Sequence, residues 1–481
     1  METTQKLIDQ IILTSDVVVR TIPYLQLEIV FITTIVDLQR IEEHILKPLT
    51  ERARIPHEQQ TEPLEEWIAN NLHVAKIKTL TSPKEAAQSL LDSAAVICSS
   101  KGYLAIDMHG QTRRTPEEPK ADTSIRGPRD GFTEIIDVNV SLIRTRVKDE
   151  KLQMKERIIG ERTKTKVLVV FIEDLANPRI VKEVFDRLDT VKIDGVLDSG
   201  TLEQWIEDNH WSPYPQMQAT ERPDKTVAAL LEGRIAIMVD GSPFVLLAPT
   251  VMLSFFQTTD DYSQRWVSGT ALRLIRIIAL LVSIFIPSLY IALTMFNPEL
   301  IPLKMVLQLA ATREGIPLPI VAEATFMEIM VELVREAGNR MPQQMGQSYT
   351  IVGGLVIGDM AVQAGIVSPI MVVAVGLTAL GAYAIPNYEA AFVTRMIRFP
   401  MLLTTSIFGI VGTIAFTLML FAHLCTLRSF GVPYLTPFVQ MAGPDLHDSL
   451  IRAPLQFSEK RPGTYWSPRK WLRRANQQKG T

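Results

Sequence analysis

Apolar residues dominate the second half of the chain in three long runs. Residues 277–298, 360–388 and 399–427 contain no Asp, Glu, Lys or Arg, and only His423 interrupts the last run. A helix needs about 20 predominantly apolar residues to cross a bilayer core of roughly 30 Å. The pattern therefore predicts an integral membrane protein with an all-α transmembrane helical bundle over residues 243–427.

The segments between these runs are irregular. Residues 243–257 are apolar but short and contain two prolines, which predicts a short or re-entrant membrane helix. Residues 300–313 include Lys304 and are expected along the membrane interface, whereas residues 317–338 are expected to form a helix that carries acids. Broken elements at membrane depth are tolerated only against protein or a water-filled cavity, so the pattern favours a conduit or transporter over a simple anchor. Four and six crossings both remain open.

The first 242 residues alternate between short strand and helix patterns, which predicts an α/β N-terminal head. We expect two subdomains, 1–125 and 126–242. The expected strands are 17–20, 27–33, 94–99, 103–107, 166–172 and 234–239. The expected helices are 37–49, 83–93, 133–146, 178–188 and 199–208.

Charge is distributed unevenly along the chain. Residues 1–242 hold 70 of the 101 charges, and the tail, 428–481, holds nine basic and three acidic residues. The basic tail suits an anionic membrane surface, while the acidic balance elsewhere argues against nucleic acid as a partner. Two cysteines cannot form a disulfide framework, which favours a reducing compartment for the head. No signal peptide opens the chain, and arginines precede the first membrane run, so head and tail are both expected in the cytoplasm.

Acidic residues within the membrane block are the sharpest candidate site. Glu323, Glu328 and Glu332 lie on the helix expected over residues 317–338. Glu328, Glu332 and Glu336 fall within an arc of about 80°, whereas Glu323 lies about 140° from Glu328. One interpretation is a carboxylate-lined ion path. The alternative is an amphipathic interfacial helix in which Glu332 pairs with Arg335.

Other residues offer weaker candidates. Asp359, between two apolar runs, is either a polar site in the membrane or a helix boundary. The loop that contains Arg126 and Arg129 either binds an anion or, more often for such a segment, forms a structural turn. Close helix packing is expected for a set of small residues, namely Gly353, Gly354 and Gly358.

Signals of catalysis are absent from the sequence. The chain has no Walker loop, no Gly-x-Ser-x-Gly elbow, and no His-Glu-x-x-His among its seven histidines. We therefore expect neither an enzyme nor a bound metal or cofactor.

An ordered set of segments resembles the A subunits of GerA-type spore-germination receptors from endospore-forming bacteria. It includes Arg-Gly-Pro-Arg-Asp-Gly-Phe-Thr-Glu at 126–134, Ile-Gly-Glu-Arg-Thr-Lys-Thr at 159–165, Arg-Glu-Ala-Gly at 335–338, Ile-Val-Gly-Gly-Leu-Val-Ile-Gly at 351–358 and Gly-Val-Pro-Tyr-Leu-Thr-Pro-Phe at 431–438. Further matching segments are 45–49, 176–178, 206–209, 220–224, 231–234, 364–369 and 450–454. The sequence departs from the family in its short N-terminus and at Asp359, where a glutamate is usual.

The resemblance implies a subunit of a nutrient-sensing complex in the spore inner membrane. Such A subunits work with a permease-like B subunit, which binds the nutrient, and a lipoprotein C subunit. They are thought to form a homo-oligomeric ring that acts as a ligand-gated cation channel. The acidic segment before Arg-Glu-Ala-Gly matches the helix of Glu328, which favours the ion path. Three alternatives stay open: a paralogous sporulation protein tied to dipicolinate release, a secondary transporter of an anion, and a non-conducting scaffold.

Overall fold

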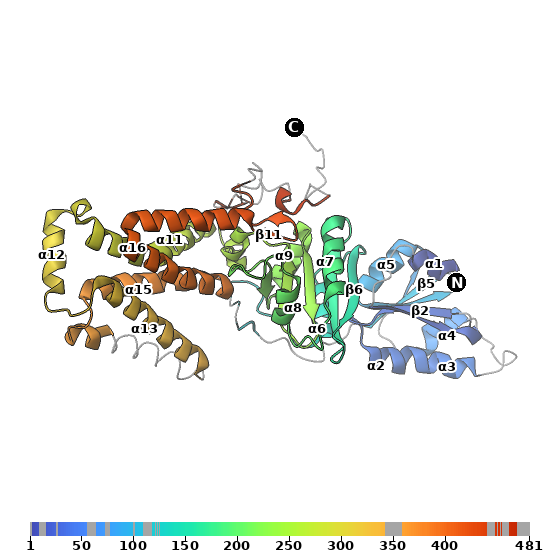
Figure 1. Cartoon of the computed structure of the whole chain (residues 1–481). Coiled ribbons are helices and arrows are strands. Elements are labelled where there is room, and N and C mark those ends of the chain that lie inside the picture. The colour runs from blue at the N-terminus through green and yellow to red at the C-terminus, as the bar shows by residue number, and fades with distance from the viewer. Residues whose placement is uncertain are drawn as a thin grey trace, which may run out of the picture.

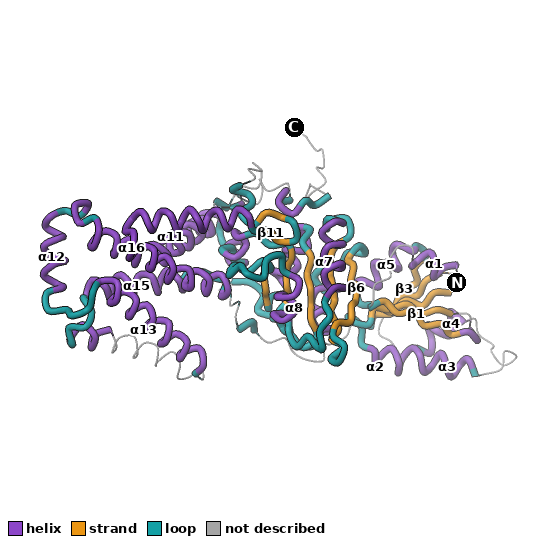
Figure 2. Tube along the Cα trace, in the orientation of Figure 1, coloured by secondary structure: helices purple, strands orange, loops and turns teal. Residues whose placement is uncertain are grey.

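The computed structural model arranges the chain as a row of three parts, with the N-terminal sheet at one end and the helical part at the other (Figures 1 and 2). The structure describes the chain except for residues 1, 9–15, 26, 55–63, 73–76, 100–101, 109–117, 121, 123, 125, 342–357, 440–447, 450, 453, 455–460 and 469–481. Most of the predicted basic tail lies outside the described residues.

The first sheet has five strands in the order β1-β2-β4-β5-β3, and every neighbouring pair is antiparallel. Its strands are β1 Val17–Ile22, β2 Leu27–Ile32, β3 Ile77–Leu80, β4 Ala94–Ser99 and β5 Gly102–Asp107. Its helices are α1 Glu2–Ile8, α2 Leu38–Ile41, the π-helical turn Glu42–Leu46, α3 Lys47–Ala53, α4 Leu64–Asn71 and α5 Pro83–Leu91. The predicted strands near residues 17 and 27 and the hairpin over 94–107 are confirmed.

The second sheet, in the order β6-β7-β9-β10-β8, is also antiparallel and carries helices on both faces. Its strands are β6 Leu152–Ile159, β7 Thr165–Ile172, β8 Gln218–Thr220, β9 Ile235–Val239 and β10 Val245–Ala248. One face packs against α7 Pro178–Thr190 and α8 Ser199–Ile206, and the other against α6 Ile136–Arg144 and α9 Pro223–Glu232. The predicted buried strands are confirmed as β7 and β9, which explains their β-branched composition.

A buried ion pair ties the two sheets of the head together. Arg144 of α6 lies 3.0 Å from Asp16, which immediately precedes β1, and the two side chains are only 3% and 5% exposed. The head is thus an α/β unit of two connected parts, in agreement with the predicted fold class.

The short or re-entrant membrane helix predicted over residues 243–257 is wrong. These residues contain strand β10, which pairs with β9 and β8 inside the second sheet, followed by a 3-10 turn at Met252–Phe255. All four residues of β10 are buried. A strand buried on both faces has the same unbroken apolar sequence as a short membrane segment, which explains the error. The second sheet therefore extends past residue 242.

Five longer helices follow the head in the described part of the chain. After α10 Thr259–Ser263 they are α11 Trp266–Ile291 with its π-helical continuation Ala292–Phe296, α12 Leu303–Arg313, α13 Ile320–Arg340, α15 Pro369–Tyr383 and α16 Tyr388–Thr426. Two helices in the described part are long and apolar enough to cross a bilayer, Trp266–Phe296 and Tyr388–Thr426. Helix α12 crosses the far end of the bundle (Figure 1).

Helix α16 reverses direction at Gly409, whose φ of 60° and ψ of −141° are non-helical. Thr405 and Thr413 on either side of the turn share a hydrogen bond of 2.8 Å. The predicted run over 399–427 is therefore not one straight span, because its residues belong to both arms of a helical hairpin. Residues 389–398, which lie between two of the predicted apolar runs, belong to the start of the first arm.

The head and the helical hairpin meet through an apolar cluster. Phe255 and Phe256 of the head pack there with Ala390 and Leu424, which belong to the two arms of α16. A short C-terminal hairpin, β11 Arg428–Ser429 and β12 Val432–Pro433, follows α16, and the 3-10 turn Gly463–Tyr465 packs its Tyr465 into the core of the second sheet. The start of the first arm of α16 and the end of its second arm are thus both packed against the head.

Candidate functional site

Helix α13 carries all three glutamates that the sequence singles out. It spans Ile320–Arg340, close to the predicted range of 317–338, and begins directly after Pro319. Glu323 and Glu328 are 0% and 1% exposed, respectively. Ionised groups at such depth require a charged or hydrogen-bonding partner.

Glu328 has its partner on another helix, far away in sequence. The guanidinium Nη1 of Arg398, in the first arm of α16, donates to Glu328 Oε2, and Arg398 is likewise 1% exposed. Thr378 of α15 donates to Glu328 Oε1 over 3.2 Å, and Arg398 Nη2 donates to Ser283 of α11 over 3.0 Å. Four helices therefore contribute to one fully buried polar cluster.

Glu323 ties the start of α13 to two neighbouring helices. Its Oε1 accepts hydrogen bonds from the backbone N–H and the hydroxyl of Ser368, both at 2.6 Å. Ser368 is the N-cap of α15. The other oxygen of Glu323 accepts from Arg313, the last residue of α12. Its charge is thus fully neutralised within the protein.

Glu332 is partly buried and has two arginine neighbours. Arg335, three residues later on α13, donates to Glu332 Oε1 over 2.9 Å, which confirms the pairing considered from the spacing. Arg395 Nε, from the first arm of α16, lies 3.3 Å from the same oxygen. The guanidinium of Arg335 also stacks 4.6 Å from the ring centroid of Tyr383.

The remaining sequence candidates have other contacts. Asp359 is exposed and accepts a hydrogen bond of 2.7 Å from Gln363 one turn later. Gly358 is buried, but a Cβ there would meet only Val372 at an ordinary 3.7 Å, and the packing role of the glycines stays a prediction. Gly353 and Gly354 lie outside the described residues.

The arginine-rich loop of the head has the contacts of a structural turn. Arg126 is exposed and its backbone N–H donates to Asp260 over 3.1 Å. Arg129 forms an exposed pair with Glu118 at 3.3 Å. Arg222, which is buried, donates to the Pro128 carbonyl over 3.3 Å and holds the loop from inside. Anion binding by this loop stays a prediction.

A second group of charged residues lies where the head meets α16, and the sequence patterns did not indicate it. Glu203 of α8 and Glu389 at the start of α16 line a cavity of about 430 Å³ together with Ser199, Ser242 and Tyr388. Burial raises the pKa of Glu203 to about 9, and the nearby carboxylates of Glu389 and Glu207 add to this rise. Among the described residues, Oε2 of Glu389 has no hydrogen-bond partner.

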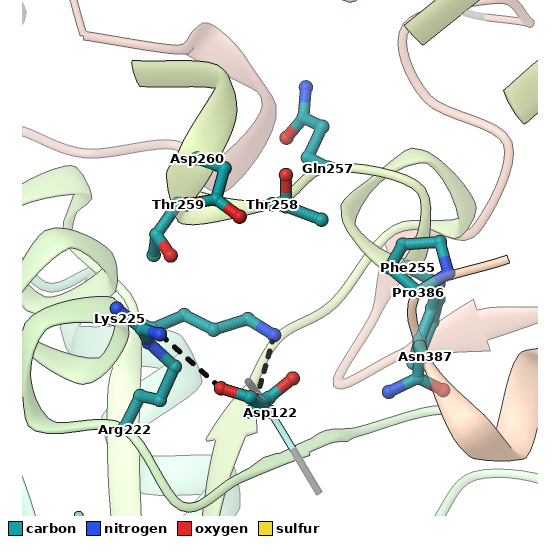
Figure 3. A pocket seen from close by; sticks show the side chains of 10 residues that line it. All are labelled: Asp122, Arg222, Lys225, Phe255, Gln257, Thr258, Thr259, Asp260, Pro386 and Asn387. Carbon is teal, nitrogen blue, oxygen red and sulfur yellow. Dashed lines mark hydrogen bonds and ion pairs between the residues drawn. The ribbon is translucent and has the colours of Figure 1, made fainter. Parts of the chain in front are cut away.

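A smaller cavity of about 150 Å³ shares Asp122, Pro386 and Asn387 with the larger one (Figure 3). In it, Lys225 Nζ donates to Asp122 Oδ2 over 3.3 Å, and Arg222 donates to the Asp122 carbonyl over 3.3 Å. Its charges are therefore already paired. In the part of the chain that the structure describes, no three His, Cys, Asp or Glu side chains gather in a way that would hold a metal ion.

The ion pairs of α13 neutralise carboxylate charges inside an apolar bundle, and breaking them would leave those charges unpaired. Three carboxylates of α13 each contact a guanidinium, and the arginines come from α12, α13 and α16. Sequence reasoning missed Arg313, Arg395 and Arg398 as partners. The one available signal was that arginines within or beside apolar runs must pair with acids.

Known proteins resemble this chain over most of its length. A family model described as Bacillus/Clostridium GerA spore germination protein matches residues 4–464. The chain is 40% identical over 455 residues to the uncharacterized membrane protein YfkQ of Bacillus subtilis (strain 168), covering 94% of this chain and 86% of the relative. It is 38% identical over 455 residues to spore germination protein KA of the same organism, covering 93% and 83%, respectively. The crystal structure of the N-terminal domain of the A subunit of the Bacillus megaterium spore germinant receptor GerK3 is 29% identical, with a TM-score of 0.38, and covers 52% of this chain and 93% of that domain.

Proposed function

Because this chain belongs to the family of Bacillus/Clostridium GerA spore germination proteins, we propose that it is the A subunit of a germinant receptor in the spore inner membrane. The two long apolar helices support the membrane location, as does the 40% sequence identity with a relative named as a membrane protein. We propose that the head and the tail face the cytoplasm. A permease-like B subunit and a lipoprotein C subunit would complete the receptor.

The activity we propose is that of a ligand-gated cation channel formed by a homo-oligomeric ring. The observation that carries this proposal is the presence of Glu323, Glu328 and Glu332 on one helix of the apolar bundle. Charged residues at membrane depth are costly and mark ion pathways more often than lipid-facing surfaces. Carboxylates repeated around a ring would attract cations. Nutrient binding to the partner subunit would shift the ring from closed to open.

Conductance measurements on reconstituted protein test this activity. The purified chain is placed in liposomes with and without the B and C subunits, and current and reversal potential are recorded in a cation gradient. We expect cation-selective current that Glu328→Gln lowers. Glu336→Gln is the matched control, since Glu336 is on the same helix but is exposed and pairs with the exposed Arg340. Equal currents for wild type and Glu328→Gln, at equal protein level, would refute the assignment of Glu328.

A non-conducting scaffold is the second candidate, and one observation favours it. Each of the three carboxylates is already neutralised by an arginine within a single protomer. Under this function the charges serve only to position helices, and the head recruits cytoplasmic partners. Deleting the head would then abolish receptor assembly, whereas the liposomes would carry no current under any condition. Anion-selective current would instead support a transporter of an anion such as dipicolinate.

A further inference from the structure

We propose that α13 is a movable helix held on the bundle by an ion-pair latch, defined as the contacts Glu323–Arg313, Glu328–Arg398 and Glu332–Arg395. In the latched state the carboxylates face arginines. In the released state the same carboxylates face water. The latch itself follows from the contacts of α13, and only the consequence of release, an opened ion path, rests on the proposed function.

The buried face of α13 differs from that of its neighbour α15 in its charge. Of the five buried residues on α13, three are ionisable, namely Glu323, Glu328 and Arg335. The six buried residues of α15 include no charged side chain. Helix α13 is therefore attached through charges in addition to the apolar cluster that its Ala324 and Met327 form with Met371 of α15, whereas the buried face of α15 carries no charge.

The contacts of the latch lead to separate elements rather than to one neighbour. Arg313 ends α12, while Arg395 and Arg398 lie on the first arm of α16. Ser368, the N-cap of α15, donates hydrogen bonds to the carboxylate of Glu323, and Thr378 of α15 donates one to that of Glu328. All of these partners would be lost together if α13 moved away from the bundle.

Ion pairs and apolar contacts respond differently to water. A buried ion pair gains attraction in a medium of low dielectric constant but loses the hydration of both partners, so its net contribution to stability is small. When the helix separates, both groups recover their hydration, whereas an apolar face would expose surface that water disfavours. The ion-paired part of the α13 interface therefore has one defined seated position, and it costs less to release than an apolar surface of the same extent, as a two-state element requires.

The first arm of α16 connects this latch to the head. Glu389, in the cavity at the head junction, precedes Arg398 by nine residues on the same helix, a distance of about 14 Å along the axis. A displacement of the start of α16 therefore carries both arginines with it. We infer that the head releases α13 by moving this arm.

Hydrogen–deuterium exchange of the full chain in lipid nanodiscs tests the latch directly. In Arg398→Gln we expect exchange within Ile320–Arg340 to rise on the order of tenfold, because opening of α13 becomes more frequent. Exchange in α11 and α15 should stay as in wild type. The matched control is Arg340→Gln, which removes an exposed pair on the same helix and should change nothing. Unchanged exchange in α13, or an equal rise in all helices, overturns the proposal.

A second variant covers the case in which Arg398→Gln does not fold. Glu328→Met combined with Arg398→Met replaces the central pair by apolar side chains of comparable length, a change that buried ion pairs often tolerate. We expect slower exchange in α13 than in wild type, and spores that fail to respond to nutrient. Equal or faster exchange overturns the latch, whatever the spores do. Slower exchange with normal germination upholds the latch and refutes the proposed function.

Discussion

The reversal of α16 at Gly409 makes a sharp prediction about one substitution. The φ of Gly409 is 60° with ψ −141°, a combination that is almost exclusive to glycine. A Cβ there would lie 2.7 Å from Cγ and 2.9 Å from Cβ of Phe296, closer than side-chain carbons normally approach. Gly409→Ala must therefore distort the turn, displace the Phe296 ring, or both.

The expected loss of stability combines two contributions. The backbone conformation costs a residue with a Cβ about 1–3 kcal/mol. Crowding against a packed side chain costs a further 1–3 kcal/mol or so, and the lower end applies because Phe296 is 38% exposed and its ring can move. We expect Gly409→Ala to destabilise the protein by about 2–4 kcal/mol in total.

Thermal unfolding of the purified full chain in detergent measures this loss. Gly376→Ala is the matched control, because Gly376 lies within α15 with nothing within 4 Å of the added methyl group. That control should be neutral or stabilising by up to about 1 kcal/mol. Adding Phe296→Ala to Gly409→Ala should relieve the crowding but not the backbone strain, so little rescue is expected from this second change. Equal melting temperatures for the two glycine variants would refute the helical reversal.

Three further predictions concern the head. Asp16→Asn removes the carboxylate that pairs with buried Arg144, and it should lower the free energy of unfolding by about 3–5 kcal/mol. The control is Glu118→Gln at the exposed pair with Arg129, which should change the free energy of unfolding by less than about 0.5 kcal/mol. Thermal unfolding measures both. Glu203 holds a proton in the folded protein up to its raised pKa of about 9, against an ordinary value of 4.5. The unfolded chain loses that proton at lower pH, so stability should fall by up to about 1.4 kcal/mol per pH unit as pH rises from the ordinary pKa of 4.5 toward the raised pKa of about 9. Glu203→Gln should therefore flatten the profile of melting temperature against pH. An unchanged profile would contradict the buried position of Glu203. Arg129→Ala should leave the melting temperature and sulfate or phosphate binding unaltered, and a loss of anion affinity in calorimetry would contradict the structural role of the loop.

The strands of the head were predictable where their local hydrophobic pattern was distinctive. Strand β7 was predictable because residues 167–172 form an unbroken apolar run in which most side chains are β-branched. Strand β10 is also an unbroken apolar run, yet it was assigned to the membrane. A buried strand and a short membrane segment share one composition, and only the pairing of β10 with β9 and β8 distinguishes them.

In the candidate site, contacts within one helix were predictable from the sequence, whereas contacts between helices were not. Helical spacing is sufficient to pair Glu332 with Arg335, since residues three apart on a helix are neighbours. The partner of Glu328 is 70 residues away in sequence, and no periodicity connects the two. The pair exists because α16 packs across α13, and this packing depends on the whole bundle.

The sequence by itself determined the division into a polar head and an apolar helical part, the strands with strong β patterns and the helix that bears Glu323, Glu328 and Glu332. These features follow from side-chain hydrophobicity and from the local periods of strands and helices, which need no knowledge of distant residues. Only the tertiary structure decided that β10 belongs to the head, that α16 turns back at Gly409, and that Arg398 neutralises Glu328. A glycine allows such a turn but does not require it. An acid in an apolar bundle needs a partner, but its own sequence does not specify which residue that is. Both features therefore depend on how distant segments pack.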